Sequence, residues 1–423
     1  MSDLLGHWQS GSACPRPGRV ETAFVSIPER SLTITHPAPQ NATAGLPQPD
    51  SVNLMASLEL ACGGPGAGLV PLDALPPQSL SHKRSVVLLI VDGLGYDYLR
   101  QTLPDGLLAR HLLCPLQSVC PATTAAAVTS FFTGLSPASH GLLGWFTPFE
   151  TGDRVVVPLL ARQRNGPALT GDDLAALYRS PPLAARLGRA CHVVTPKRIA
   201  GSAYTRHHAG PATVHGFRSL GGLFGQLERL LRADGPPRYV HAYWPLLDEL
   251  AHAHGIGHRR SREHLRQIET QLGAFLHRVG NTDATLLVTS DHGFVDIAPE
   301  RRLLLNDHPR LQARLRLPLA GESRLAFVHA RPSEREAVGH ALAVELGERA
   351  TVFSGEQFIA SGHLGAGPRH PSLAHRVGDW VVAMADGWTV RDRLPGEKPF
   401  SPVGVHGGLS PAERRVPLVL FET

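Results

Sequence analysis

A few aspartates and histidines in this chain directly follow short apolar runs. Asp92 follows VVLLIV, and Asp291 and His292 follow TLLVTS. An Asp-Gly pair at the end of a strand is more often a turn than a ligand. Adjacent Asp and His side chains point in different directions on a regular strand, but they can converge on one ion where the strand opens into a loop. Carboxylate oxygen and imidazole nitrogen are suitable ligands for Zn²⁺ or Mn²⁺.

A helical segment and a glycine-rich loop supply further candidates. In YWPLLDELAHAHG, Asp248 and His252 are four residues apart and share one helix face, although such a pair can also be a surface contact. His406 lies in VGVHGG, where glycines allow the backbone to bring the imidazole close to an ion; an ordinary turn histidine is the alternative. His254 and His258 come just after the helical pair, and we expect both to be non-ligands.

The stretch CPATTAAAVTSFFTG places two hydroxyls at the start of an apolar helix. Thr124 would lie in the first turn, where unpaired backbone N–H groups and the helix dipole favour an anion. A threonine hydroxyl is a poor nucleophile unless a metal ion beside it holds it as an alkoxide. Threonine is also a good N-cap residue, which is the structural alternative. Together, the carboxylates, imidazoles and Thr124 could build two adjacent cation sites suited to phosphoryl transfer.

The elements that must position these residues are strands alternating with helices. Apolar runs of strand length occur at SVVLLIV, HVVTP, RYVHAYW, ATLLVTS, LAFVHA, DWVVAMA and VPLVLF, with helical segments between several of them. Continuous apolar runs are typical of strands covered on both faces. In such sheets, ligands lie beyond the carboxyl ends of the strands. We therefore predict an α/β sandwich with a mostly parallel central sheet between helices.

The chain before this pattern is expected to form an N-terminal arm and helix over residues 1–83. Residues 1 to about 50 are rich in Pro, Ser, Thr and Gly, with one short strand predicted at TAFVSI. The segment SVNLMASLELACGG then has leucines at helical spacing and ends in a glycine pair typical of a helix C-cap.

Composition narrows the classes of function. The chain has 41 Lys and Arg against 36 Asp and Glu, and its formal net charge of +5 is scattered, so we expect no dedicated nucleic-acid patch. Its five cysteines contain no C-x-x-C pair, which argues against a disulfide framework or zinc knuckle. The first residues do not resemble a signal peptide, and no apolar run approaches roughly 20 residues. We expect a cytoplasmic protein without a membrane span.

These motifs together resemble the alkaline phosphatase superfamily, most closely its nucleotide pyrophosphatase/phosphodiesterase branch. The resemblance rests on VDGLG, CPATTAAAVTSFFTGLSPASHG, DELAHAHG, SDHG and VHGG, which occur in the family's order over roughly residues 84–423. It implies an alkaline-phosphatase-like sandwich that holds two divalent ions, zinc by preference and Mn²⁺ as the alternative. The implied ligands are Asp248, His252 and His406 for one ion, and Asp92, Asp291 and His292 for the other, with Thr124 bridging toward it.

The resemblance also implies a reaction and a domain organisation. Thr124, chosen over Thr123 by the family interval to Thr133-Gly134, would attack a small phosphorylated substrate and cleave a phosphodiester or pyrophosphate through a phosphothreonine intermediate. A phosphomonoesterase, phosphonate hydrolase or phosphomutase with the same metal core is the first alternative, and a catalytically silent binding protein is the second. Insertions at about 146–235 and 301–395 of the catalytic domain (84–423) would form cap elements.

One feature departs from the family pattern. Many family diesterases have an asparagine shortly after the HG of the first long motif, where it binds a phosphoryl oxygen, but this chain has Gly144 and Trp145 there. A second donor must come from elsewhere, or the substrate is handled differently. Lys197 and Arg198 are candidate substrate contacts, with exposed surface positions as the alternative. Trp145 and its neighbour Phe146 could form an apolar wall for a leaving group, or pack in the core.

One histidine of the same motif is expected to be structural. His140 belongs to the SHG that closes the motif. The resemblance gives it no place among the metal ligands.

Overall fold

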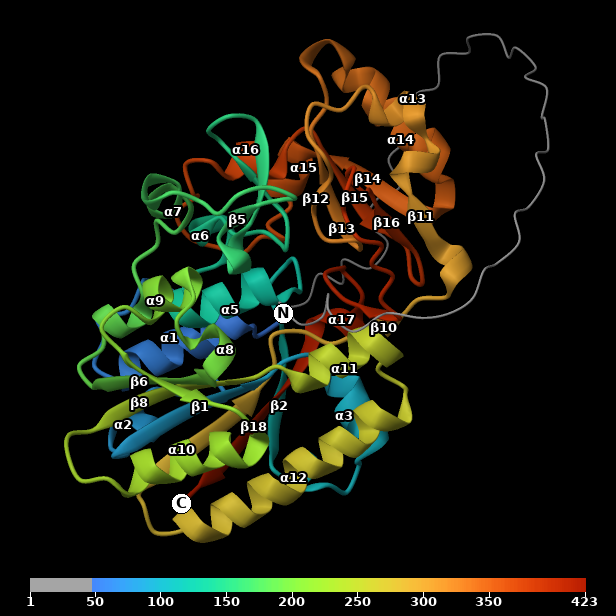
Figure 1. The fold of residues 1–423 in the computed structure, drawn as a ribbon. Coiled ribbons are helices and arrows are strands. Elements are labelled where there is room, and N and C mark those ends of the chain that lie inside the picture. Colours follow the sequence, from blue (N-terminus) through green and yellow to red (C-terminus); the bar gives the residue numbers. More distant parts are fainter. Residues whose placement is uncertain (1–47) are drawn as a thin grey trace. The chain divides into compact units, whose positions relative to one another are not determined.

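The structure is a computed structural model that describes residues 48–423, so the strand predicted at TAFVSI lies outside the described residues. Its centre is a seven-stranded sheet in the order β2-β18-β9-β1-β8-β6-β7 (Figure 1). The strands are β1 (Ser85–Val91), β2 (Leu112–Gln117), β6 (Ala190–Pro196), β7 (Thr213–Phe217), β8 (Arg238–Trp244), β9 (Ala284–Thr289) and β18 (Arg415–Glu422).

Most neighbours in this sheet are parallel. β1 pairs in parallel with both β8 and β9, so that Ser85 lies opposite Arg238 on one side and Ala284 on the other. β6 pairs in parallel with β7 and β8, whereas β18 is antiparallel to β9 and β2. Every residue of β1 is buried. The predicted α/β fold with a mostly parallel central sheet is confirmed.

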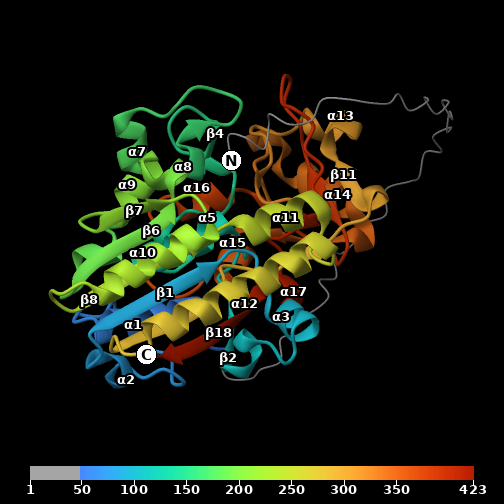
Figure 2. The same ribbon diagram turned by 60° about the horizontal axis from the view of Figure 1, so that its bottom comes forward.

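Helices cover both faces of the sheet (Figures 1 and 2). Val87, Leu89 and Val91 of β1 pack with helices α10 (Leu220–Arg232) and α12 (Arg259–Val279). The alternate residues Val86, Leu88 and Ile90 pack with α1 (Ser51–Ala61) and α5 (Thr124–Thr133) on the opposite face. This alternation of side chains is the reason that a strand buried on both faces is apolar throughout.

Helix α1 confirms the helix expected before residue 84, but it does not stand apart from the sheet. Leu54, Met55 and Leu58 are completely buried in the core that includes β1. The chain from Pro47 to Thr423 forms one compact unit. The boundary drawn at residue 83 therefore moves toward the N-terminus, because α1 supplies part of the core that covers the sheet.

The insertion expected at about 146–235 is shorter in the structure. Only its first part leaves the central sheet, as the small antiparallel sheet of β3 (Thr147–Phe149), β4 (Arg154–Val157) and β5 (Arg162–Gln163). β6 and β7 form the edge of the central sheet, and α10 covers it. The expected cap at 146–235 is corrected accordingly, since β6 pairs in parallel with β8 on one side and with the edge strand β7 on the other.

The insertion expected at 301–395 contains a second, four-stranded antiparallel sheet, which we call the cap sheet. It consists of β12 (Ala320–Gly321), β13 (Leu325–Val328), β14 (Ala350–Ser354) and β15 (Trp380–Met384). The apolar runs LAFVHA and DWVVAMA thus form β13 and β15 of the cap sheet and not strands of the central one.

Two further expectations concern cysteines and membranes. The four cysteines of the described part, Cys62, Cys114, Cys120 and Cys191, are free. Between residues 48 and 423, none of the helices combines the length and apolar character that crossing a bilayer requires.

Candidate metal centre

All predicted ligands except His406, which follows the short strand β17 (Gly404–Val405), come from segments after the carboxyl ends of three neighbouring strands. Asp92 directly follows β1, and Asp291 and His292 follow β9. Asp248 lies in the first turn of α11 (Leu246–His254), which begins just after β8. The loops after β1 and β9 are tied together, because the Gly93 N–H donates to Asp291 Oδ1 at 3.2 Å. The strand order therefore explains why residues far apart in the sequence meet here.

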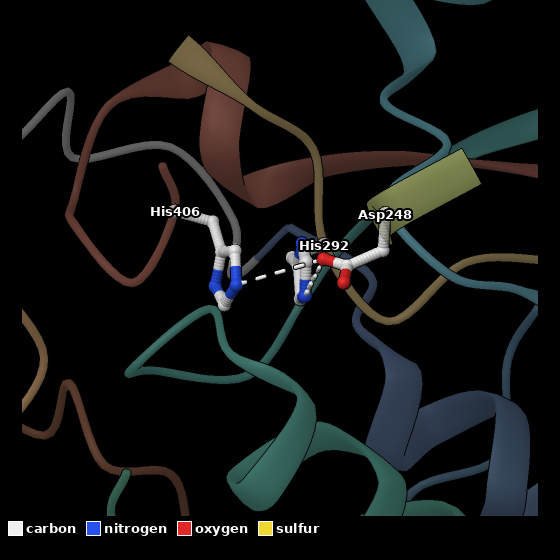
Figure 3. Close-up of side chains that lie close together, drawn as sticks. All are labelled: Asp248, His292 and His406. Atoms are coloured by element: carbon white, nitrogen blue, oxygen red, sulfur yellow. Dashed lines mark ion pairs between the residues drawn. The ribbon is translucent and has the colours of Figure 1, made fainter. Parts of the chain in front are cut away.

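Two groups of buried side chains could each hold a metal ion, and they share one histidine. Asp92, Asp291 and His292 form the first group, with His292 Nε2 lying 3.3 Å from Asp92 Oδ1 and 3.4 Å from Asp291 Oδ2. Asp248, His292 and His406 form the second (Figure 3). In that group, Asp248 Oδ1 lies 4.0 Å from His292 Nε2 and 3.7 Å from His406 Nε2.

His252 adjoins the second group through Asp248. Its Nε2 lies 3.4 Å from Asp248 Oδ1, and its ring centroid lies 5.1 Å from that of His406. The family resemblance implies that His252 binds the same ion as these two residues and that His292 binds only the other, whereas His292 belongs to both groups in the structure. The division of ligands between two ions stays a prediction.

All three histidines of the centre are oriented in the same way. Their Nδ1 atoms hydrogen-bond backbone carbonyls: His252 to Gly404 at 2.9 Å, His292 to Gly293 at 3.1 Å and His406 to Ala122 at 3.3 Å. An Nδ1–H that donates to a carbonyl leaves the Nε2 lone pair free. In each case Nε2 is the ring nitrogen near the aspartates. A histidine that binds a metal through Nε2 must carry its proton on Nδ1, and these hydrogen bonds favour that tautomer.

The aspartates of the centre carry buried oxygens that lack partners. Asp92 Oδ1, Asp248 Oδ1 and Asp291 Oδ2 accept no hydrogen bond from the described residues. Burying an unpaired carboxylate is costly unless a cation compensates it. Oxygen and nitrogen donors in this arrangement fit divalent ions such as Zn²⁺ or Mn²⁺, so the residues present fit a binuclear site.

The electrostatics of the centre agree with that assignment. Burial, followed by the charges of Asp248 and Asp291, raises the pKa of Asp92 well above its ordinary value. Burial raises the pKa of Asp248 to about 7. Burial also lowers the pKa of His252 to about 4 and that of His406 well below its ordinary value. The imidazoles of His252 and His406 are therefore neutral, and the crowded carboxylates lack positive charge that a cation would supply.

Three residues that support the metal ligands were not predicted from the sequence. The Tyr243 hydroxyl donates to Asp92 Oδ2, and the Ser118 hydroxyl donates to the backbone carbonyl of Asp291. The Ser290 hydroxyl donates to the His292 carbonyl at 2.8 Å. Tyr243 lies within the apolar run of β8, where only the need of a buried phenol for a partner could have drawn attention to it.

Of the two adjacent threonines, Thr124 faces the metal centre. It is the first residue of α5, is half-buried, and its hydroxyl lies 3.2 Å from His292 Nε2. Thr123 occupies the N-cap position, but its side chain makes no capping hydrogen bond. Its hydroxyl instead donates to Glu322 Oε1 at 2.6 Å. The capping alternative therefore explains neither hydroxyl.

Trp145 contacts the same carboxylate. Its backbone N–H donates to Glu322 Oε1 at 2.6 Å. Glu322 follows β12, and the sequence analysis did not single it out because nothing in its local pattern marks it. The neighbouring Phe146 lies under the Arg164 guanidinium, whose carbon is 4.1 Å from the ring centroid. That contact accounts for Phe146 by packing, and a leaving-group contact of Trp145 stays a prediction.

The two basic candidates lie at the surface. Lys197 and Arg198 begin the short helix α8 (Lys197–Ala200), and both are exposed. Arg198 forms an ion pair with Glu249, the residue after Asp248. Neither belongs to the two metal groups found in residues 48–423. Their part in substrate binding stays a prediction.

The remaining motif histidines have structural contacts. His140 is buried; its Nε2 lies 3.0 Å from Ser130 Oγ, and its Nδ1 accepts the Leu142 N–H at 3.1 Å. His258 is the N-cap of α12, and His254 stacks on it with ring centroids 5.1 Å apart. Neither of the latter two belongs to the two groups found in residues 48–423, and their role as non-ligands stays a prediction.

Comparison with solved structures identifies relatives of this fold. Murine ectonucleotide pyrophosphatase/phosphodiesterase 5 is 18% identical with a TM-score of 0.61, and the match covers 79% of this chain and 87% of that one. An inactive variant of it, in which one threonine is replaced by alanine, was solved in complex with AMP. Phosphonoacetate hydrolase from Sinorhizobium meliloti, in complex with phosphonoformate, is 16% identical with a TM-score of 0.59, covering 80% and 90%. At these identities the likeness establishes an alkaline-phosphatase-like fold.

Sequence comparison identifies the family of this chain, which the structural matches alone do not. No curated protein matches this chain. A family model described as type I phosphodiesterase / nucleotide pyrophosphatase matches residues 86–409. The match spans most of the chain and runs through both metal groups, from Asp92 to His406. The chain therefore belongs to the type I phosphodiesterase/nucleotide pyrophosphatase family.

Proposed function

We propose that this protein is a two-metal hydrolase that cleaves a phosphodiester or pyrophosphate bond in a small phosphorylated substrate, with Thr124 as nucleophile. One observation carries the proposal: partnerless buried oxygens of three aspartates lie close to the Nε2 atoms of three histidines, and one of these, His292 Nε2, lies beside the Thr124 hydroxyl. Zinc is the proposed metal, with Mn²⁺ as the alternative, because both accept oxygen and imidazole ligands.

In this proposal, Asp92, Asp291 and His292 would hold one ion, and Asp248, His252 and His406 would hold the other. When bound, two such ions supply positive charge to the attacking oxygen, the phosphoryl oxygens and the leaving oxygen. The chain supplies the nucleophile and the orientation. Thr124 stands at the first turn of α5, where backbone N–H groups and the helix dipole favour a phosphoryl oxygen.

The proposed reaction has two displacements. Thr124 Oγ1 attacks phosphorus in line, so that an Oγ1–P bond forms while the bond from phosphorus to the leaving oxygen breaks. The leaving oxygen departs with the electron pair of that bond, and the hydroxyl proton of Thr124 passes through solvent to that oxygen. A water molecule then attacks from the opposite side, the Oγ1–P bond breaks, and Thr124 regains its hydroxyl proton.

A second candidate function has support from one relative. Phosphonoacetate hydrolase was solved with phosphonoformate and with phosphonoacetate, and its fold matches this one as well as that of the pyrophosphatase does. A phosphonate hydrolase, phosphomonoesterase or phosphomutase with the same metal core is therefore the alternative. Parallel rates on bis-p-nitrophenyl phosphate, p-nitrophenyl phosphate and phosphonoacetate separate the classes, and a faster monoester or phosphonate rate would favour the alternative.

The nucleophile is tested by Thr124→Ala in the zinc-loaded full-length protein. We expect diester hydrolysis to fall by at least about 10³-fold, the order expected when a covalent nucleophile is removed. Metal content should stay nearly unchanged, and mass spectrometry of acid-quenched wild type should find the phosphoryl adduct on Thr124. Thr170→Ala is the control, because Thr170 lies at the start of another helix as the N-cap of α7 (Gly171–Leu177) and belongs to neither of the two metal groups. Full activity of the Thr124→Ala variant would refute the assignment.

A further inference from the structure

Glu322 reaches from the cap sheet to the loop that carries the candidate nucleophile. It lies in the turn between β12 and β13. Its Oε1 accepts two hydrogen bonds, from the Thr123 hydroxyl and from the Trp145 backbone N–H, each 2.6 Å long. Burial raises the pKa of Glu322, whereas these two donors and the nearby positive charge of Arg391 favour its ionised form. Apart from these two donors, no described residue hydrogen-bonds to the Glu322 side chain, so its Oε2 can accept a further hydrogen bond.

The surroundings of Glu322 fix it in this place. A Cβ built on Gly407, which has φ +107°, would come within 2.6 Å of Glu322 Cβ, so the loop after His406 packs directly on this side chain. On the other side of the turn, the Arg324 guanidinium bonds Glu413 Oε2 at 2.9 Å, and both side chains are completely buried. The turn is therefore anchored to the C-terminal segment and cannot withdraw without breaking a buried ion pair.

This position borders the space where a phosphoryl group would bind. Glu322 contacts the neighbour of Thr124 on one side and the neighbour of His406 on the other. It also contacts Trp145, the position at which the family pattern expects an asparagine. An asparagine amide would donate a hydrogen bond to a phosphoryl oxygen, whereas a carboxylate can only accept one. At this position the chain offers no side-chain amide, and the carboxylate that contacts its backbone N–H can only accept hydrogen bonds when ionised.

We propose that Glu322 is a specificity-determining residue that selects monoanionic phosphodiesters over dianionic phosphomonoesters. The inference rests on the proposed function and deepens it. A monoester carries one more negative charge than a diester, and placing like charges together disfavours the wrong ligand. A diester that presents a hydroxyl or amine near Glu322 Oε2 would gain a hydrogen bond as well.

The inference is tested by Glu322→Gln in the zinc-loaded full-length protein. The variant keeps the shape of the side chain and an acceptor for both donors but removes the charge. We expect kcat/KM for p-nitrophenyl phosphate to rise relative to bis-p-nitrophenyl phosphate by about tenfold or more compared with wild type. Glu150→Gln is the control, because Glu150 pairs with the buried Arg376 at 3.0 Å and should not change this ratio.

A binding measurement completes the test. Calorimetry at pH 8, where inorganic phosphate is mainly a dianion, should find that phosphate binds the Glu322→Gln protein about tenfold more tightly than wild type. Glu322→Ala removes the whole carboxylate group. If the glutamine variant does not fold, the ester ratio and the phosphate affinity are measured with the alanine variant instead. An unchanged ester ratio together with unchanged phosphate affinity would overturn the inference. If wild type cleaves neither ester, the proposed function fails, while phosphate affinity still decides the role of Glu322.

Discussion

The metal centre and the cap sheet both bury charged side chains, but they do so in opposite ways. In the metal centre, Asp92, Asp248 and Asp291 each keep a buried oxygen that no described residue bonds. Arg324, which directly precedes β13 of the cap sheet, is also completely buried. Its guanidinium, however, donates to Glu413 and to the backbone carbonyls of Ala385 and Trp388. Charge that is satisfied within the chain stabilises the fold. Charge that is left unsatisfied marks the place where something else must bind.

A second ion pair of the cap follows the same rule. Arg164 is buried, and its guanidinium bonds Asp392 Oδ1 and Glu397 Oε1, each at 2.8 Å. Fully paired groups of this kind make the insertion a rigid support for Glu322. The metal centre, by contrast, should be the least stable part of the protein until cations bind.

The largest expected effect comes from removing one unpaired charge of the metal centre. Asp92→Asn should lower diester hydrolysis by at least about 10³-fold, because one cation site loses a ligand. In the metal-free protein, the same change should raise the melting temperature, since it relieves repulsion from Asp248 and Asp291. Calorimetry and initial rates test both effects. Asp97→Asn, at a residue paired with Arg415 at 3.1 Å, is the control. A destabilised metal-free variant would contradict the account.

The reverse effect is expected for a paired charge. Arg324→Met should lower the free energy of unfolding by about 3–5 kcal/mol, because Glu413 is left buried without its partner. The double variant Arg324→Met/Glu413→Leu should recover most of that loss. Urea unfolding of the metal-free proteins measures both values. A loss below about 1 kcal/mol in the single variant would remove the distinction between the two regions.

Metal binding should make the two regions more alike. Zinc at about 100 times its dissociation constant should stabilise the protein by about 2.7 kcal/mol, and a chelator should reverse the effect. Asp248→Ala should lose most of this stabilisation, because Asp248 Oδ1 lies within 4.0 Å of Nε2 of all three histidines of the centre. Urea unfolding with and without zinc is the measurement. Equal stabilisation of the variant would count against the site.

The smallest expected effect concerns a buried group outside both regions. His241 of β8 has no hydrogen-bond partner on either ring nitrogen, and burial lowers its pKa to about 3. Between pH 6.5 and 3 the unfolded chain therefore binds a proton that the folded chain does not. The free energy of unfolding should decrease by about 1.4 kcal/mol for each unit by which the pH is lowered in this range.

His241→Phe tests that slope. A phenyl ring keeps the stacking on Phe132, whose ring centroid lies 4.1 Å from that of His241. Urea unfolding of the metal-free variant between pH 7 and 5 should show a smaller loss of stability than wild type. The exposed His277, replaced by glutamine, is the control. An unchanged slope in His241→Phe would show that this histidine is not the source.

The sequence predicts well those site residues that follow strands. Asp92, Asp291 and His292 come directly after apolar runs, and parallel strands bring their carboxyl ends together. Local pattern and spacing are sufficient in these cases because each residue is positioned by the element next to it. Local pattern also indicates a helix start at the two threonines, but the choice of Thr124 over Thr123 came from the family resemblance.

Residues positioned by distant elements could not be found in this way. Glu322 reaches Thr123 across 199 positions of the chain, and its contact depends on how the cap sheet packs. Tyr243 looks like core in the apolar run of β8, although its hydroxyl holds Asp92. The extent of the insertion at 146–235 was misjudged for a related reason, since strand pairing decides whether β6 belongs to the central sheet.

The most direct test of the central claim is an anomalous difference map at the zinc absorption edge, from crystals of the zinc-loaded protein. The account predicts two peaks roughly 4 Å apart. One should lie among Asp92, Asp291 and His292, with the Thr124 hydroxyl beside it, and the other should lie beside Asp248 and His406. A single peak, or zinc bound only at other residues, would contradict it.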